Sequence, residues 1–292
     1  MNSWHARVAL GNQGGRVFYV KLTKRGPQYF IGGNWVEGEP SVAAGHQRIY
    51  ESHLPAGVRL ANVILADDEK RLLATEVVPG VNLKALLSKR SQPRGLDVYH
   101  YMWLAGRALA VWHLMDGRSS QLRGAQVRRY LDFSVWNVLV DREDQSITIL
   151  DFPGAVAMGS HYEDMATFLH SMLVVRHHPL VRLKRLAWWD WREAFGSFLE
   201  GYCETAQVAT TSLDGEAVCT ALHETIEREK TRYGTRSWNP RYRLEHAWYA
   251  RMSADLNLSS SVLREAVSRA GSRRVRTAEE TSGETKTGAV PK

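Results

Sequence analysis

The sequence has few of the residues that mark the specialised classes of protein. It contains only two cysteines, Cys203 and Cys219, and their spacing matches no metal-binding motif, so a disulfide scaffold is excluded and reduced thiols are expected. With 9 prolines, 23 glycines and 44% apolar residues, the chain is neither collagen-like nor intrinsically disordered. The composition therefore predicts a globular protein.

Long hydrophobic runs are also lacking. No stretch reaches the ~18 uncharged apolar residues that a membrane-spanning helix needs, and the first residues lack the apolar core of a secretory signal. We therefore expect no membrane span and a cytoplasmic location.

Positive charge is in excess, with 38 basic and 31 acidic residues and a net charge of +7. An excess of this sign favours anionic partners. The basic residues lie in short, scattered runs with no nucleic-acid-binding motif beside them. We therefore expect no nucleic-acid partner.

The chain divides into a strand-rich first part and a helical second part. Runs of β-branched and aromatic residues bounded by Gly, Pro or Asp predict one helix at 42–54 and strands at 6–10, 16–22, 28–31, 58–65 and 72–78. From Asp97 onward, apolar residues recur at helical spacing and predict helices at 97–115, 163–175, 182–205, 215–232 and 242–256. Asp97 is in the position to cap the first of these helices. Two short strands, 137–140 and 147–150, interrupt this second part.

These patterns predict two lobes and a tail. The first lobe covers residues 1–78, the helical lobe covers 79–270, and the polar, non-periodic residues 271–292 are expected to be disordered. A joint between two lobes commonly forms a cleft that binds ligands.

Three polar residues stand at the ends of the apolar runs in this strand pair. A hairpin of 137–140 and 147–150 would bring Asp151 back beside Asn137, where an amide oxygen and a carboxylate could hold Mg²⁺ shared with substrate phosphates. Asp132, five residues before Asn137, could accept or orient the proton of an attacking hydroxyl. Each residue alone is an ordinary turn former. The ordered set indicates phosphoryl transfer.

These segments, Asp132-Phe-Ser-Val-Trp-Asn137 and Leu150-Asp151-Phe152, resemble the protein-kinase-like superfamily, in particular the small-molecule branch that includes aminoglycoside phosphotransferases and choline kinases. That family carries His-Gly-Asp-x-x-x-x-Asn in its catalytic loop and Ile-Asp-Phe at its metal-binding strand. The resemblance implies an α+β, bilobal protein-kinase-like fold with a small β-rich N-lobe and a larger, mostly helical C-lobe. It also implies ATP and Mg²⁺ as cofactors, Asp132 as catalytic base, and Asn137 and Asp151 as magnesium ligands.

The similarity extends to both sides of the loop. The segment from Glu76 to Leu83 resembles the family's hinge, which implies that main-chain atoms near Glu76 and Val78 bind adenine. Asp164 resembles the helical carboxylate that steadies the catalytic loop. The sequence departs from the family at Tyr130, where a histidine is usual, and at Pro153 after the Asp-Phe pair.

The lysine that should hold the nucleotide phosphates has two possible positions. In one register, 16–22 is the lysine-bearing strand and Lys21 is the phosphate clamp. Phosphate would supply a reason for a cation at a buried strand edge, which favours this register. Its carboxylate partner would be one of Glu37, Glu39 and Glu51.

In the other register, the glycine cluster at 11–15 covers the phosphates. Residues 28–31 then lead to Gly32 at the lysine position, and Glu51 has the spacing of the partner glutamate. This register removes the lysine. A tight hairpin explains the glycine cluster equally well.

The leading functional hypothesis is an ATP- and Mg²⁺-dependent phosphotransferase that acts on a hydroxyl of a small molecule. The segment between Asp151 and Asp164 is short and has no Ala-Pro-Glu sequence, whereas protein kinases use a longer segment there as a platform for peptides. The alternatives are a nucleotide-binding pseudokinase and a compact, atypical protein kinase.

Overall fold

The computed structural model describes residues 3–9, 17–23, 28–31, 34–89, 96–115, 126–177, 188–208 and 212–234, together with 247, 249, 250 and 265. The first part of the chain forms strands and one helix: β1 (Ser3–Ala9), β2 (Val17–Thr23), β3 (Gln28–Ile31), β4 (Asn34–Glu37), α1 (Pro40–Glu51), β5 (Val58–Leu60), β6 (Val63–Asp67) and β7 (Leu72–Glu76). This part corresponds to the predicted strand-rich lobe.

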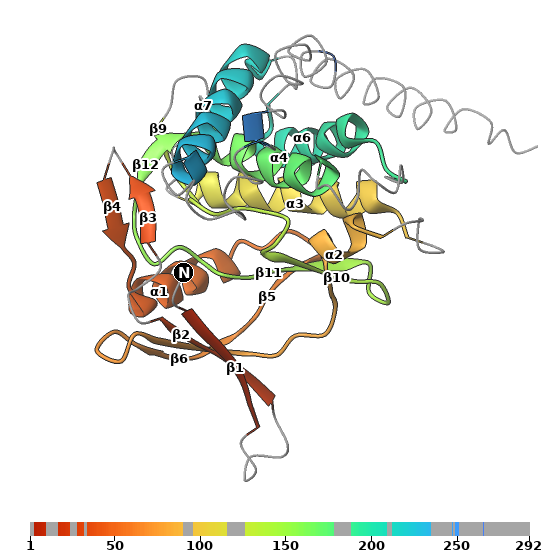
Figure 1. The fold of residues 1–292 in the computed structure, drawn as a ribbon. Coiled ribbons are helices and arrows are strands. Elements are labelled where there is room, and N and C mark those ends of the chain that lie inside the picture. Colours follow the sequence, from red (N-terminus) through yellow and green to blue (C-terminus); the bar gives the residue numbers. More distant parts are fainter. Residues whose placement is uncertain are drawn as a thin grey trace, which may run out of the picture.

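The second part is mainly helical. It contains α2 (Leu83–Leu87), α3 (Val98–Leu114), α4 (His161–His177), α6 (Trp191–Ala206) and α7 (Gly215–Gly234), with the short strands β8 (Val81–Asn82), β9 (Gln126–Arg128), β10 (Val138–Asp141), β11 (Ser146–Ile149) and β12 (Met158–Ser160). The mixed α+β architecture is confirmed, and in Figure 1 the helices α3, α4, α6 and α7 lie above the strands β1, β2, β5, β6, β10 and β11. Among the described residues, no helix combines the length and the apolar character that crossing a bilayer requires.

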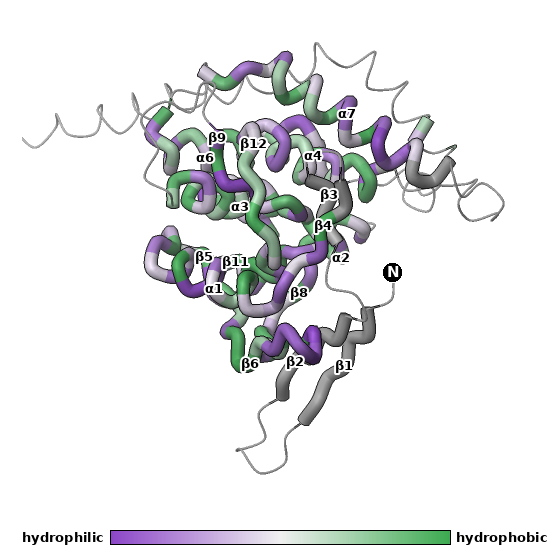
Figure 2. Tube along the Cα trace, turned by 90° about the vertical axis from the view of Figure 1, so that its left-hand side faces the viewer, coloured by the Kyte–Doolittle hydropathy of each residue, from purple (hydrophilic) through white to green (hydrophobic). Residues whose placement is uncertain are grey.

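Two four-stranded sheets form the lower half of the molecule. The first is antiparallel, with strand order β1-β2-β7-β6. The second, in the order β5-β11-β10-β8, combines a strand from the first part of the chain with the predicted hairpin of the second part. Figure 2 shows the same separation, with β2 and β6 at the bottom and α3, α4, α6 and α7 at the top. The second sheet therefore joins the two parts of the chain.

Helix α3 is the centre of the helical part. Asp97 caps it as predicted, because its Oδ1 accepts a hydrogen bond from the backbone nitrogen of Tyr99 at 3.0 Å. Many of its side chains are fully buried, among them Met102, Leu109 and Trp112. The main body of the apolar core surrounds this helix.

Helices α3 and α6 approach each other closely because each has a glycine at the crossing. A Cβ atom added at Gly106 would overlap the carbonyl oxygen of Phe198, and one added at Gly201 would overlap that of Trp103. Only a residue without a side chain fits at either point.

Some predicted boundaries are wrong. Residues 182–187 of the helix predicted at 182–205 lie outside the described residues, residues 188–190 are not helical, and α6 begins at Trp191 with Asp190 as its cap. The strand predicted at 58–65 is split at residues 61–62, and the strand predicted at 72–78 ends at Glu76. Most of the helix predicted at 242–256 and the predicted tail, apart from residues 247, 249 and 250, lie outside the described residues.

The close crossing predicts that Gly201→Ala destabilises the protein. The added methyl group must push α3 and α6 apart, and overpacking of this kind costs about 1 to 3 kcal/mol or more. Urea unfolding measures the loss. Gly45→Ala in α1 is the matched control, because a Cβ there meets nothing within 4 Å and alanine favours a helix over glycine by up to about 1 kcal/mol. Equal stability of the two variants would contradict the close packing of α3 and α6 at Gly201.

Candidate functional site

The hairpin of β10 and β11 brings Asn137 and Asp151 to the same end of the sheet. Val138 pairs with Ile149, and the next backbone contact is a hydrogen bond of 2.8 Å from the nitrogen of Leu150 to the carbonyl oxygen of Asn137. Asp151 follows directly. The backbone arrangement predicted for this hairpin is therefore confirmed.

The side chain of Asn137 links this hairpin to Asp132. Its Nδ2 donates to the carbonyl oxygen of Asp132 at 2.9 Å and to the carboxylate Oδ2 of Asp132 at 3.1 Å. Asn137 is buried, whereas Asp132 and Asp151 are exposed. The amide of Asn137 and the carboxylate of Asp132 are thus in contact, and the backbone of the exposed residue Asp151 begins beside Asn137.

This donor set fits a magnesium ion. Oxygen atoms are the ligands that Mg²⁺ prefers, and it usually binds one or two carboxylates together with substrate phosphates. Because Nδ2 of Asn137 bonds to Asp132, its Oδ1 faces away and is the atom suited to a cation. In the part of the chain that the structure describes, no three His, Cys, Asp or Glu side chains cluster closely enough to hold a metal ion.

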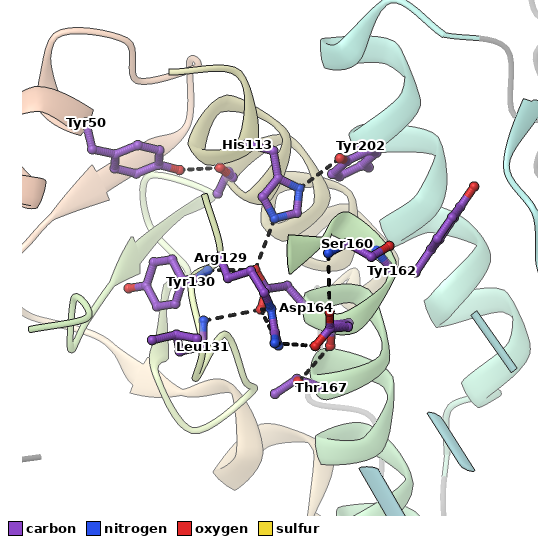
Figure 3. A network of polar contacts seen from close by, with 12 residues as sticks. Tyr50, His113, Arg129, Tyr130, Leu131, Ser160, Tyr162, Asp164, Thr167 and Tyr202 are labelled. Carbon is purple, nitrogen blue, oxygen red and sulfur yellow. Dashed lines mark hydrogen bonds and ion pairs between the residues drawn. The ribbon is translucent and has the colours of Figure 1, made fainter. Parts of the chain in front are cut away.

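Asp164, near the start of α4, holds the first half of the loop that carries Asp132 (Figure 3). Its carboxylate accepts hydrogen bonds from the backbone nitrogens of Tyr130 at 2.6 Å and Leu131 at 3.2 Å. It also accepts from Nε2 of His113 at 3.1 Å and from the guanidinium of Arg129 at 3.2 and 3.3 Å. The role that the sequence indicated for Asp164 is confirmed by these contacts.

The carboxylate of Asp164 is fully buried and remains ionised. Burial alone would raise its pKa, but the hydrogen bond from His113, the positive charge of Arg129 and the N–H of Tyr130 together lower it. The ring of His113 connects the carboxylate to α6, because its Nδ1 lies 2.8 Å from the hydroxyl of Tyr202. Because an ionised carboxylate only accepts, Nε2 of His113 carries the proton that it donates to Asp164.

A second contact from α4 holds the other half of the loop. The Oγ of Ser171, seven residues after Asp164 and therefore on the same face of the helix, accepts a hydrogen bond of 3.0 Å from the nitrogen of Val135. From the other side, the nitrogen of Lys84 donates to the carbonyl oxygen of Val135, and Nδ2 of Asn82 donates to that of Trp136. Ser171 and Asn82 were not predicted from the sequence. The available signal for Ser171 was a polar residue among the apolar residues of the predicted helix.

Two residues at this site have a backbone conformation that is unusual for their type. Five non-glycine residues with positive φ are described, and Arg71 and Gln145 lie in hairpin turns while Gln207 caps α6. The other two are Leu131, with φ of 69°, and Asp151, with φ of 53°. Such conformations cost roughly 1 to 3 kcal/mol and cluster at functional sites.

The predicted phosphate clamp lies partly outside the described residues. The backbone of Lys21 belongs to β2, opposite His5 of β1 and Leu73 of β7, but its side chain is outside the described part, as are residues 11–15 and Gly32. Within the described part of the chain, strand β3 pairs with β4 in a separate two-stranded sheet.

The candidate carboxylate partners of Lys21 lie in α1 and in the residues that precede this helix. Glu37 forms an ion pair of 3.3 Å with Arg71. Glu39 precedes α1 and is exposed, and Glu51 is exposed as the last residue of that helix. None of these contacts distinguishes which glutamate would serve Lys21.

The predicted hinge follows β7. The backbone nitrogen of Glu76 donates to the carbonyl oxygen of Asn62 at 2.9 Å, and the nitrogen of Asn62 donates to Oε1 of Glu76 at 3.1 Å. Val78 is half-buried in the connection to β8. A main-chain contact of Glu76 with adenine would therefore use its carbonyl oxygen.

His161 is a buried polar residue beside the Asp164 network. His161 is 2% exposed, and its ring lies 6.5 Å from the ring of His113 and stacks against Tyr202. Neither ring nitrogen has a hydrogen-bond partner among the described residues. Burial lowers the pKa of His161 to about 4, and the neighbouring His113 acts in the same direction. The ring is therefore neutral at pH 7.

Comparison with known proteins detects a likeness in structure. No family model matches the sequence, and no curated protein matches it. The solved structure of a glucosamine kinase is similar with a TM-score of 0.50 and 13% identity, covering 87% of this chain and 80% of that one. At this identity the likeness shows the fold alone, so the two-lobed, kinase-like fold implied by the sequence is confirmed.

Two other solved structures are similar at lower scores. Ethanolamine kinase of Plasmodium vivax has a TM-score of 0.48 and 8% identity, with 86% of this chain and 81% of that chain covered. An aminoglycoside-3'-phosphotransferase of type VIII has a TM-score of 0.43 and 18% identity, with 76% and 92% covered.

The low pKa of His161 predicts that stability falls as the pH is lowered. Between pH 6.5 and 4 the unfolded chain binds a proton on this residue that the folded chain does not bind, so stability rises with pH across this window. At about 1.4 kcal/mol per pKa unit the loss by pH 4 is roughly 3 kcal/mol. Urea unfolding of wild type and His161→Phe at a series of pH values measures it. The variant should lose less, and equal losses would contradict the assignment.

Proposed function

We propose that this protein is an ATP- and Mg²⁺-dependent phosphotransferase that moves the γ-phosphate to a hydroxyl group of a small molecule. The observation that carries the proposal is the convergence of Asp132, Asn137 and the backbone leading into Asp151 at one exposed edge. Strained conformations at Leu131 and Asp151 support it, because the surrounding bonds hold both residues away from their preferred geometry.

Each residue of the edge has a role in this proposal. Asp132 accepts or orients the proton of the attacking hydroxyl, and the amide of Asn137 keeps its carboxylate in place. Asp151 and the Oδ1 of Asn137 are the magnesium ligands. The bound ion would neutralise charge on the phosphates as the bond to the leaving group lengthens.

The nucleotide would lie between this edge and the strands of the first part. Main-chain atoms at Glu76 and Val78 would bind adenine, and Lys21 would hold the phosphates. The sheet order supports the Lys21 register, since β2 lies directly beside β7, the strand that leads into the hinge, whereas β3 is not in that sheet. Glu51 remains one of the candidate partners of the lysine.

A small acceptor is supported by the segment after Asp151. It is short, and its end forms β12, which pairs with β9 and leads directly into α4. A segment fixed in this way offers little extended surface for a polypeptide. The fold does not determine which hydroxyl compound is used.

The proposal predicts that Asp132→Asn and Asp151→Asn lose activity while the protein remains folded. Loss of a general base lowers turnover by about 10² to 10⁴, and loss of the Asp151 charge should abolish turnover with Mg²⁺. ADP release in a screen of hydroxyl acceptors measures the rate. Asp144→Asn is the matched control, because Asp144 lies in the turn of the same hairpin and its side chain forms only an exposed ion pair, with Arg59 of β5, among the described residues.

The outcomes separate the alternatives. Unchanged turnover in Asp151→Asn would contradict the proposed site. Stabilisation of the wild type by Mg-ATP without turnover on any acceptor would support a nucleotide-binding pseudokinase.

Lys21→Ala is expected to lower turnover by ~10² or more, because one charge contact to the transition state is lost. The same acceptor assay measures the rate. A rate close to that of the wild type would favour the register in which Gly32 occupies the lysine position.

A further inference from the structure

The segment that follows β11 is held at its start by Tyr130. The hydroxyl of Tyr130 donates a hydrogen bond of 2.9 Å to the carbonyl oxygen of Leu150. That carbonyl belongs to the peptide unit that joins Leu150 to Asp151. The peptide unit is planar and includes the backbone nitrogen of Asp151, so a bond that holds its carbonyl oxygen also limits rotation at φ of Asp151.

The same segment is held at its end by α1. Nδ1 of His46, a buried residue, lies 2.7 Å from the carbonyl oxygen of Pro153, and because a carbonyl oxygen only accepts, Nδ1 carries the proton. The next carbonyl oxygen, of Gly154, accepts a hydrogen bond of 2.7 Å from the nitrogen of Glu39. The start of α1 and its buried face thus both bind this segment.

Two features between these contacts limit the freedom of Asp151 further. Phe152 is buried, and its ring lies within 6 Å of the rings of Tyr50, Trp112 and Tyr130. Pro153 has a fixed φ and restricts the residue before it to extended conformations. The backbone can therefore adjust mainly at Asp151, where φ is 53°.

We propose that His46 and Tyr130 are positioning residues that together hold Asp151 in its left-handed conformation and so direct its carboxylate toward the metal. The inference rests on the proposed function, because it assigns the metal to Asp151. It also makes α1 part of the metal site, since the side chain of His46 in that helix forms a hydrogen bond with the Asp151 segment.

The test compares metal binding in matched variants. Tyr130→Phe removes only the hydroxyl, and His46→Leu removes the donor. Each should weaken the affinity for Mn²⁺ in the presence of ADP by about 10-fold or more, because the carboxylate loses its fixed direction. Titration of MnCl₂ followed by electron paramagnetic resonance measures this affinity. Binding of ADP in the presence of a chelator should be unchanged.

Two further variants separate positioning from stability. Tyr50→Phe is the matched control, because it removes a buried hydroxyl bond of 2.5 Å to the carbonyl oxygen of Ala108 without touching a carbonyl of residues 150–154. It should lower the melting temperature and leave the Mn²⁺ affinity unchanged. His46→Asn, whose amide nitrogen can replace Nδ1 as donor, should restore the affinity lost in His46→Leu.

Each outcome has a distinct meaning. Wild-type Mn²⁺ affinity in Tyr130→Phe and His46→Leu would overturn the inference while leaving the proposed function intact. An equal loss in Tyr50→Phe would also overturn it, because general destabilisation would then be the cause. A wild-type protein that binds no Mn²⁺ with ADP would overturn the proposed function itself. If His46→Leu does not fold, Tyr130→Phe, which keeps the ring, decides the question.

Discussion

The site depends on the hydrogen bonds and the ion pair that the buried carboxylate of Asp164 forms. A charge that is withdrawn from water must be paired and hydrogen-bonded, and here the donors come from α3 through His113 and from residues 129–131. Satisfying this one group therefore fixes the distance between α3, α4 and the loop that carries Asp132. It also stabilises the unusual conformation of Leu131, the residue next to Asp132.

Asp132 and Asp151 are exposed, but the elements that hold them are joined by hydrogen bonds and strand pairing. Helix α4 binds the loop at two points, the second sheet supplies the hairpin, and α1 binds the segment after Asp151. Because β5 from the first part of the chain lies in the same sheet as the hairpin, the two parts are joined at the site itself. In the proposed phosphotransferase, groups fixed in this way would need little reorganisation when charge develops, which is the condition for electrostatic catalysis.

The sequence predicted most elements because their signals are local. Two short apolar runs with an acidic turn between them predicted the hairpin of β10 and β11, and Asp97 predicted the start of α3. The start of α6 was predicted too early. Trp189 is buried there and donates to the carbonyl oxygen of Leu87, a contact with a distant element that periodicity does not contain. Strands β8, β9 and β12 are only two or three residues long, too short to show a pattern in the sequence, and they form by pairing with other strands.

The sequence by itself determined the class of fold and the order of the polar residues in the middle of the chain, since apolar periodicity and turn chemistry act between near neighbours. Only the tertiary structure decided how those residues are held. The contacts of His46 with Pro153, Ser171 with Val135 and Asp164 with Tyr130 join residues 34 to 107 positions apart. No local pattern encodes such contacts, because they exist only when packing brings the elements together.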